Sequence, residues 1–320
     1  MPDPQAQPSS LKKWVIAARP WALPASTIPV LYGTTVAYVA GYSNFHLLRF
    51  ALAASAMILL HSAANMMSDV FDFKRGVDRE VTPLSGALVR GWLTPGQVAG
   101  GSLFLFAAGI AIGLALIRMS GAYLLLWVGA AGIAVGAAYA RLKSLALGDL
   151  AVFLDFGILG GLGAYLVQKP RFSWVPVIWT IPLALLVSAI LHANNWRDAT
   201  SDREKRVITV AGLLGDRGSL AYYGFLLFSP FVIILGLVFI PRLGPPYSWA
   251  MPLPACGVLA ALPAALSLWK KARRRHSPVH PMDFALLDAA TARFNLVFGL
   301  ILTASIWVQY VLEALFHWPY

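Results

Sequence analysis

The sequence predicts an all-α membrane protein, a polytopic bundle of about nine transmembrane helices around a central cavity. Two features of composition indicate this class: 58% of the 320 residues are hydrophobic, and only 12% are charged. Soluble domains carry roughly 25% charged residues. The mean hydropathy of +0.68 agrees with a chain that lies mostly in lipid.

The third observation is a series of apolar runs of about 20 residues, the length that crosses a hydrocarbon core of ~30 Å. In chain order the runs cover residues 21–40, 47–68, 98–117, 120–140, 148–167, 174–194, 219–240, 248–269 and 294–316. The polar, proline-containing segment 1–11 is expected to be a disordered tail. It precedes a predicted single transmembrane domain, 12–320, with cytoplasmic loops near 69–97 and 196–218.

The lysines and arginines divide unequally between the two sides of the predicted bundle. With the N-terminus in the cytoplasm, 20 of the 25 fall on the cytoplasmic side and 5 on the other. Membrane proteins carry such an excess on their cytoplasmic loops. We therefore expect a multi-pass protein of the cytoplasmic (inner) membrane with its N-terminus inside. Since the basic residues follow this topology rather than one soluble face, the net charge of +11 does not indicate nucleic-acid binding.

A row of oxygen-bearing side chains follows the second apolar run. Asn65, Asp69 and Asp72 are spaced by four and three residues, which places them on one face of a helix. We call these three residues the first wall. The polar residues around it are Ser68, Lys74, Arg75 and Asp78.

A second row follows the sixth apolar run. Asn194, Asp198 and Asp202 are spaced by four residues each, and we call them the second wall. Arg197 and Arg203 stand beside it. Single aspartates near a helix end are often caps or solvated charges, but six oxygen-bearing residues in two matching rows favour a binding site.

The chemistry of the two walls points to a metal and a phosphate. Oxygen ligands suit Mg²⁺, which keeps several waters and joins carboxylates to substrate phosphates. Basic side chains can bind the phosphate oxygens that a metal leaves uncovered. The candidates for this role are Lys74, Arg75, Lys143, Arg197 and Arg203. Two such walls facing each other would form a cage for Mg²⁺ and a diphosphate.

Several segments also carry a family resemblance. They are Arg19–Gly33 (RPWALPASTIPVLYG), Asp72–Asp78 (DFKRGVD), Tyr139 with Lys143, Leu147–Leu150 (LGDL) and Asn194–Arg203 (NNWRDATSDR). In this order they resemble the UbiA superfamily of intramembrane aromatic prenyltransferases. Within it, the chain looks most like the 1,4-dihydroxy-2-naphthoate polyprenyltransferases of menaquinone synthesis.

The resemblance implies an enzyme that transfers a polyprenyl group from a prenyl diphosphate to a small aromatic acceptor inside the membrane. The expected acceptor is 1,4-dihydroxy-2-naphthoate, giving demethylmenaquinone, and the alternatives are 4-hydroxybenzoate and homogentisate. A lateral opening to membrane lipid is expected for the substrate's tail.

The resemblance also assigns roles to residues. Asp69, Asp72, Asp198 and Asp202 would hold two Mg²⁺ ions on the diphosphate. Asn65 and Asn194 would assist, and Asp78 is a third acid of the first motif. Tyr139, Lys143 and Arg197 match positions around the diphosphate. The chain departs from the family pattern at Ser68, where Asn is usual, at Arg206-Val207, where Gly-Lys is common, and at Asp149, where Glu is usual.

Asp155 stands inside the fifth apolar run, where an ionisable group is costly and faces a partner or a polar cavity. The sequence leaves both interpretations open. An ion-coupled membrane transporter is the competing class of function, because such proteins place carboxylates near the bilayer centre. Both walls lie at predicted helix ends instead, which favours the enzyme.

Overall fold

A computed structural model describes residues 8–40, 44–76, 86–205, 207–240, 250–280 and 282–316. Across these ranges the chain is helical, and one isolated bridge pairs Leu145 with Ile208. The elements in chain order are α1 (Ser10–Ala18), the 3-10 turn η1 (Pro20–Ala22), α2 (Pro24–Val39), α3 (Leu47–Lys74), α4 (Pro95–Ser120), α5 (Leu124–Lys143), α6 (Gly148–Val152), the π-helical η2 (Phe153–Leu159), α7 (Gly160–Gln168), α8 (Trp174–Glu204), α9 (Val210–Phe239), the 3-10 helix η4 (Leu253–Ala261), α10 (Leu262–Arg273) and α11 (Leu287–Phe316). The predicted all-α class is confirmed.

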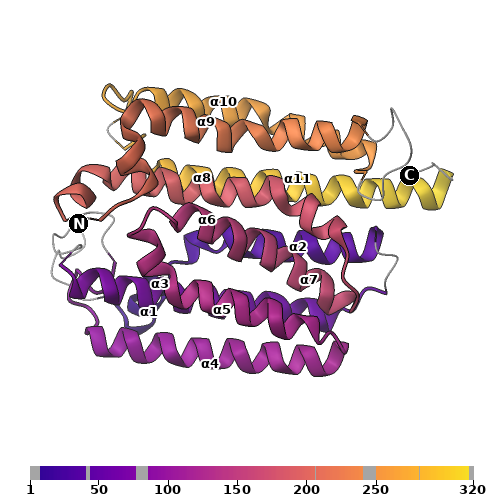
Figure 1. Ribbon diagram of the computed structural model, residues 1–320, viewed down its shortest axis with the longest axis horizontal. Helices are drawn as coiled ribbons and strands as arrows, with labels where there is room; N and C mark the ends of the chain where they lie inside the picture. The colour runs from indigo at the N-terminus through magenta and orange to yellow at the C-terminus, as the bar shows by residue number, and fades with distance from the viewer. Residues whose placement is uncertain are drawn as a thin grey trace.

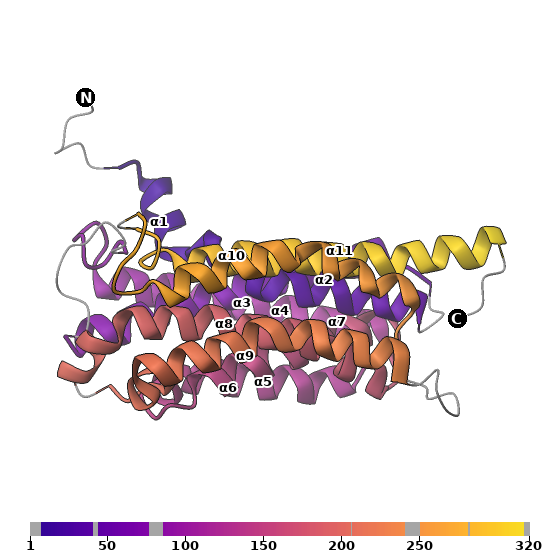
Figure 2. The same ribbon diagram turned by 90° about the horizontal axis from the view of Figure 1, so that it is seen from above.

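The long helices lie along one common direction, and α1 projects at an angle from the bundle (Figures 1 and 2). Within the described ranges, seven segments are long and apolar enough to cross a membrane: α3, α4, Gly148–Gln168, α8, α9, Leu253–Arg273 and α11. Two further apolar helices, α2 and α5, complete the correspondence with the predicted runs, although α2 has 16 residues and the apolar part of α5 is Leu124–Tyr139. The chain is therefore a multi-pass membrane protein.

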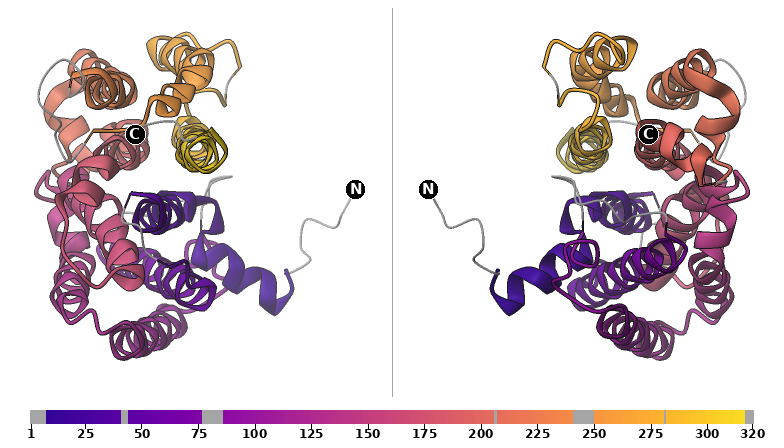
Figure 3. Two further views of the ribbon diagram at one scale, coloured as in Figure 1. Left: turned by 90° about the vertical axis from the view of Figure 1, so that its right-hand side faces the viewer. Right: turned by 90° about the vertical axis from the view of Figure 1, so that its left-hand side faces the viewer.

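Seen end-on, α2 to α5 occupy one half of the bundle and α9 to α11 the other (Figure 3). The largest buried cluster joins the halves through α2, α8, α9, η4 and α11, with Tyr32, Trp179 and Phe298 at most 1% exposed. Glycines allow the closest approaches. A Cβ added to Gly33 of α2 would lie 2.1 Å from the carbonyl oxygen of Gly161 in α7.

The predicted loop near 196–218 is wrong over most of its length. Helix α8 continues to Glu204, and α9 begins at Val210, where the Thr209 side chain accepts a hydrogen bond from the Gly212 amide. The 31 residues of α8 extend over about 46 Å, more than a ~30 Å hydrocarbon core. The charged C-terminal end of α8 thus continues as helix beyond the apolar span. Helix α9 is kinked at Gly215.

Two other predicted boundaries also change. Helix α3 continues to Lys74 and α4 begins at Pro95 behind a capping box of Thr94 and Gln97, so the predicted loop 69–97 is helical at both ends. Helix α1 begins at Ser10, inside the predicted tail 1–11, because the Ser9 side chain caps it. Residues 77–85 and 1–7 lie outside the described part of the chain.

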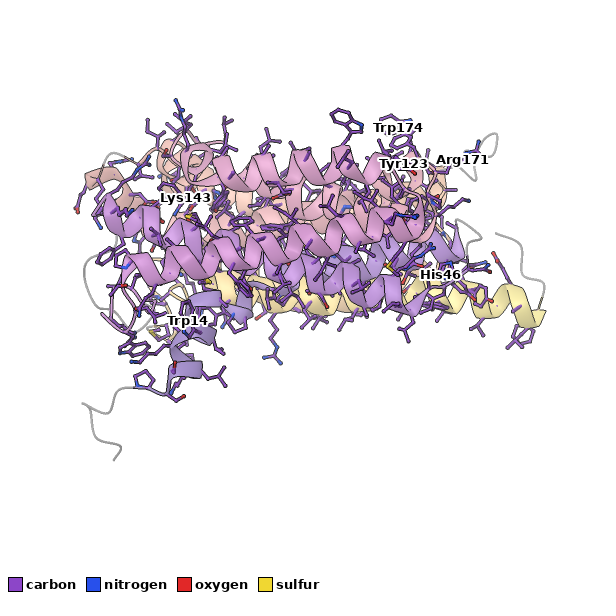
Figure 4. The ribbon with its side chains drawn as sticks, turned by 90° about the horizontal axis from the view of Figure 1, so that it is seen from below. Trp14, His46, Tyr123, Lys143, Arg171 and Trp174 are labelled. Carbon is purple, nitrogen blue, oxygen red and sulfur yellow. The ribbon has the colours of Figure 1, made fainter. Side chains whose placement is uncertain are left out.

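The polar ends of three helices meet at one end of the bundle. Figure 4 places Lys143, the last residue of α5, at the same end as Trp14 of α1. His46 and Trp174, from which α3 and α8 start, lie at the opposite end with Tyr123. The C-terminal ends of α3, α5 and α8 therefore lie on the same side of the bundle.

Candidate active site

Lys143 contacts the first wall and lies within electrostatic range of the second. Its Nζ is 3.8 Å from Asp72 Oδ2 of the first wall. The charges of Asp198 and Asp202 in the second wall also act on this ammonium group. Asp202 is 4% exposed. The cation at the end of α5 thus links two carboxylate rows that lie more than 100 residues apart in the sequence.

Arg19 contacts the other aspartate of the first wall. Its guanidinium Nη2 donates a hydrogen bond to Asp69 Oδ1. Arg19 joins α1 to η1 with left-handed backbone angles, φ 54° and ψ 60°, a conformation that is uncommon for non-glycine residues. Gly86 approaches the same carboxylate, since a Cβ there would lie 3.3 Å from Asp69 Oδ2. The sequence analysis named Arg19 only as the first residue of a segment that carries the family resemblance, and it assigned this residue no contact with the first wall.

Arg197, beside the second wall, binds the Asp198 carboxylate in bidentate fashion. Its Nε lies 2.8 Å from Oδ1 and its Nη2 lies 2.9 Å from Oδ2. Its Nη1 donates to Asp288 Oδ2 at 2.8 Å. The Asn194 amide donates to the same oxygen at 3.1 Å. Asp288, in the first turn of α11, therefore anchors the second wall. The sequence analysis missed it, because no spacing relates residue 288 to either wall.

The remaining predicted residues are placed as follows. Lys74 and Arg75 are exposed at the end of α3 and make no ion pair with the described residues. Arg203 donates to the Gly212 carbonyl at 3.2 Å rather than to a carboxylate. Tyr139, like Phe156, packs against a small apolar cluster of Ala25, Val152 and Val187. Ser68 is partly buried beside Asp69, and Asp78 lies outside the described residues.

The polar groups suit a metal that shares its ligands with a phosphate. Across the described ranges, no group of three or more His, Cys, Asp or Glu residues is close enough to hold a metal ion without other ligands. Mg²⁺ usually takes one or two carboxylates and completes its shell with substrate phosphates and waters, and the walls provide such oxygens. The buried Asn65 Nδ2 has no hydrogen-bond partner among the described residues, so it can serve as a donor to a phosphate oxygen.

The sequence analysis also did not predict that Asp149 and His192 form a buried pair near the second wall. Asp149 of α6 is 3% exposed and His192 of α8 is fully buried, with Oδ2 and Nδ1 3.3 Å apart. The His192 ring lies 6.2 Å from the ring of Trp196, which directly precedes Arg197. This pair joins α6 to α8 beneath the charged residues.

An apolar cavity of about 260 Å³ opens among α2, α3, α4, α5, η2 and α7. Its lining includes Ala64, the neighbour of Asn65 in the first wall, and Val167 at the C-terminal end of α7. Asp155 is the one charged side chain among the described residues that line it. The cavity can therefore take a hydrocarbon chain that starts beside the walls.

Acidic and basic groups at one end of the bundle, with an apolar cavity beside them, suit a membrane protein whose ligand has a charged head and an apolar tail. Residues 26–287 match the UbiA prenyltransferase family, so the chain belongs to that family and is a prenyltransferase by class. The superfamily expected from the sequence is confirmed.

The curated relatives share about a third of their residues with this chain. The UbiA prenyltransferase domain-containing protein 1 of Xenopus tropicalis is 32% identical over 297 residues, which cover 91% of this chain and 82% of the relative. The protein of the same name from Homo sapiens is 32% identical over 293 residues, or 90% of this chain and 81% of the relative. These names do not specify an aromatic acceptor.

Solved structures with the same fold are more distant in sequence. The apo structure of a UbiA homolog from Aeropyrum pernix K1 has a TM-score of 0.64 at 19% identity, covering 89% of this chain and 98% of that one. A UbiA homolog from Archaeoglobus fulgidus bound to GPP and Mg²⁺ has a TM-score of 0.57 at 14% identity, covering 91% and 99%. They establish the fold.

Proposed function

We propose that the protein transfers a polyprenyl group from a prenyl diphosphate to a small aromatic acceptor, with Mg²⁺ as cofactor. The observation that carries this proposal is the contact of Lys143 with Asp72 of the first wall, within electrostatic range of the second wall. An apolar cavity whose lining includes Ala64, the neighbour of Asn65, lies next to this site. The Archaeoglobus fulgidus homologs, described as bound to DMAPP or GPP with Mg²⁺, support the choice of substrate and metal.

The diphosphate would bind at the polar end of the bundle. Asp69, Asp72, Asp198 and Asp202 would hold the Mg²⁺. When bound, Mg²⁺ withdraws charge from the diphosphate and so assists the breaking of the allylic C–O bond. Lys143 and the cations that already contact the walls, Arg19 and Arg197, would bind the remaining phosphate oxygens.

The cavity would hold the prenyl chain and keep water from the reacting carbon. Its lining is apolar except at Asp155, and a dry site protects an allylic cation from quenching by water. Phe156, whose ring lies 4.3 Å from that of His61, is an aromatic surface in the cavity wall close to the first wall. Aromatic faces stabilise cations within about 6 Å.

For the acceptor we propose 1,4-dihydroxy-2-naphthoate, because the sequence motifs most resemble enzymes that use it. Its electron-rich ring would attack the allylic carbon as diphosphate leaves, and loss of the carboxylate as CO₂ would restore the aromatic ring and give demethylmenaquinol, the reduced form of demethylmenaquinone. The alternatives are 4-hydroxybenzoate and homogentisate. We further propose that the polar end of the bundle faces the cytoplasm from the inner membrane, since 20 of the 25 Lys and Arg residues fall on that side.

The test is product formation by the purified protein in detergent. With Mg²⁺, prenyl diphosphates of several lengths and each of the three acceptors in turn, we expect one acceptor to give a prenylated product by mass spectrometry, with release of diphosphate. Absence of both signals with every acceptor would contradict the proposal. The Asp155 carboxylate inside the bundle is the feature that favours a transporter, and substrate uptake in proteoliposomes that survives mutation of both walls would support that class.

A further inference from the structure

Asp155 occupies an unusual place in the cavity wall. It belongs to η2, a π-helical segment between α6 and α7, and π-helical segments often occur at functional sites. Its carboxyl group lies against α5. A Cβ on Gly132 would stand 2.9 Å from Oδ1 and one on Gly136 would stand 3.9 Å from Oδ2. The two glycines thus leave the room that the carboxyl group fills.

Asp155 makes no hydrogen bond or ion pair with the described part of the chain, although the sequence left pairing with a cation open. A carboxyl group in apolar surroundings costs several kcal/mol unless a partner satisfies it. The cavity provides no such partner, since every other described residue in its lining is apolar. A ligand that carries a hydrogen-bonding group into the cavity can supply this partner.

The position of Asp155 relates it to the proposed reaction centre. The neighbouring Phe156 packs on His61, one helical turn before Asn65 of the first wall. Gly136, beside the carboxyl group, precedes Lys143 by seven residues, or about 10 Å along α5. A small aromatic ring and its substituents fit within such a distance of the diphosphate site.

We propose that Asp155 binds a phenolic hydroxyl group of the aromatic acceptor and so orients the ring beneath the diphosphate. A prenyl chain is a hydrocarbon and has no group that can satisfy a carboxyl, whereas a hydroxylated acceptor has one. This inference rests on the proposed prenyl transfer and extends it to the acceptor site. It assigns Asp155 a role in acceptor binding and none in binding the diphosphate.

The test separates the KM of the acceptor from that of the prenyl diphosphate. In Asp155→Leu the acceptor KM should rise about tenfold, the effect of losing one hydrogen bond of ~1.4 kcal/mol, while the KM of the prenyl diphosphate stays within about twofold. Asp155→Asn keeps a polar partner and should show a smaller rise. Replacing the acceptor by its methyl ether should weaken the wild type and leave Asp155→Leu almost unchanged.

Two glycine variants test the geometry without removing the carboxyl group. Gly132→Ala should raise the acceptor KM, because the new Cβ would displace Asp155 Oδ1. Gly100→Ala, on α4 with open space around the added Cβ, is the matched control and should leave both KM values unchanged. Gel filtration and thermal unfolding of each variant verify that it folds, and calorimetry gives the acceptor Kd independently of turnover.

The outcomes distinguish the two proposals. An unchanged acceptor KM and Kd in folded Asp155→Leu and Asp155→Asn would overturn this inference. A change confined to prenyl-diphosphate KM or to preferred chain length would overturn it as well, since it would place Asp155 on the tail. A wild-type protein that forms no product with any acceptor would instead contradict the proposed function.

Discussion

Arg197 Nη1 lies 2.8 Å from Asp288 Oδ2, a contact between residues 91 positions apart in the chain. The same guanidinium group holds both oxygens of Asp198. Asp288 therefore fixes the direction in which Arg197 presents Asp198 at the site. Because Asn194 donates to the same Asp288 oxygen, one carboxylate at the start of α11 orients both Asn194 of the second wall and the adjacent Arg197.

The first prediction concerns this anchor. In Asp288→Ala the protein should fold but lose about 10- to 100-fold in kcat/KM for the prenyl diphosphate, the usual cost of removing a residue that orients a metal-binding carboxylate. Asp288→Glu should restore part of the activity. Asp283→Asn, in the preceding loop, removes a partly buried partner of Lys271 and serves as control. Activity in Asp288→Ala equal to that of the control would show that Arg197 needs no anchor.

The architecture of this protein was largely predictable, because lipid forces each spanning segment to be long, apolar and helical. Each of the nine apolar runs corresponds to a helical segment. The ends of the helices were not predictable from hydropathy. Residues 195–204 are mostly polar, yet they continue α8 as helix, and a hydropathy pattern cannot separate such an extension from a loop.

The site was predictable only where its residues share one helix face. Helical spacing identifies the residues of the first wall, Asn65, Asp69 and Asp72, and it identifies those of the second wall in the same way. Asp288 gives no such signal, because only the packing of α11 against α8 brings it to Arg197. Asp155 was visible as an ionisable residue in an apolar run, but the two glycines and the cavity that face it belong to other parts of the fold.

The second prediction concerns the walls. Asp69→Asn, Asp72→Asn, Asp198→Asn and Asp202→Asn should each lower kcat by at least about 100-fold. On the proposed mechanism, each change removes a charge that would hold Mg²⁺ on the leaving diphosphate. Thermal unfolding in detergent should show that the variants keep their fold. Glu313→Gln, near the other end of α11 and bonded to Gln309, is a carboxylate control. Near wild-type rates in all four variants would exclude the walls as the metal site.

The third prediction concerns metal and substrate together. Because the described residues form no group of three metal-binding side chains, Mg²⁺ alone should shift the melting temperature little. Mg²⁺ with a prenyl diphosphate should stabilise the fold by about 2.7 kcal/mol at a hundredfold excess over Kd, and EDTA should reverse both this shift and the activity. A full shift with Mg²⁺ alone, measured by differential scanning fluorimetry, would show that the protein completes the metal site by itself.

The last prediction tests the helix packing that supports the cavity. Gly33 of α2 faces Gly161 of α7, and a Cβ on Gly33 would meet backbone atoms of Gly161 at 2.1 to 3.0 Å. Backbone cannot rotate away as a flexible side chain can, so Gly33→Ala should lower the unfolding free energy by about 1–3 kcal/mol or more. Gly100→Ala should be neutral or slightly stabilising, because its Cβ meets nothing within 4 Å and alanine favours helix. Since α2 and α7 both line the cavity, Gly33→Ala should also reduce prenyl transfer. Equal melting temperatures for Gly33→Ala and Gly100→Ala would contradict the prediction, because they would show that α2 and α7 lie farther apart than this packing requires.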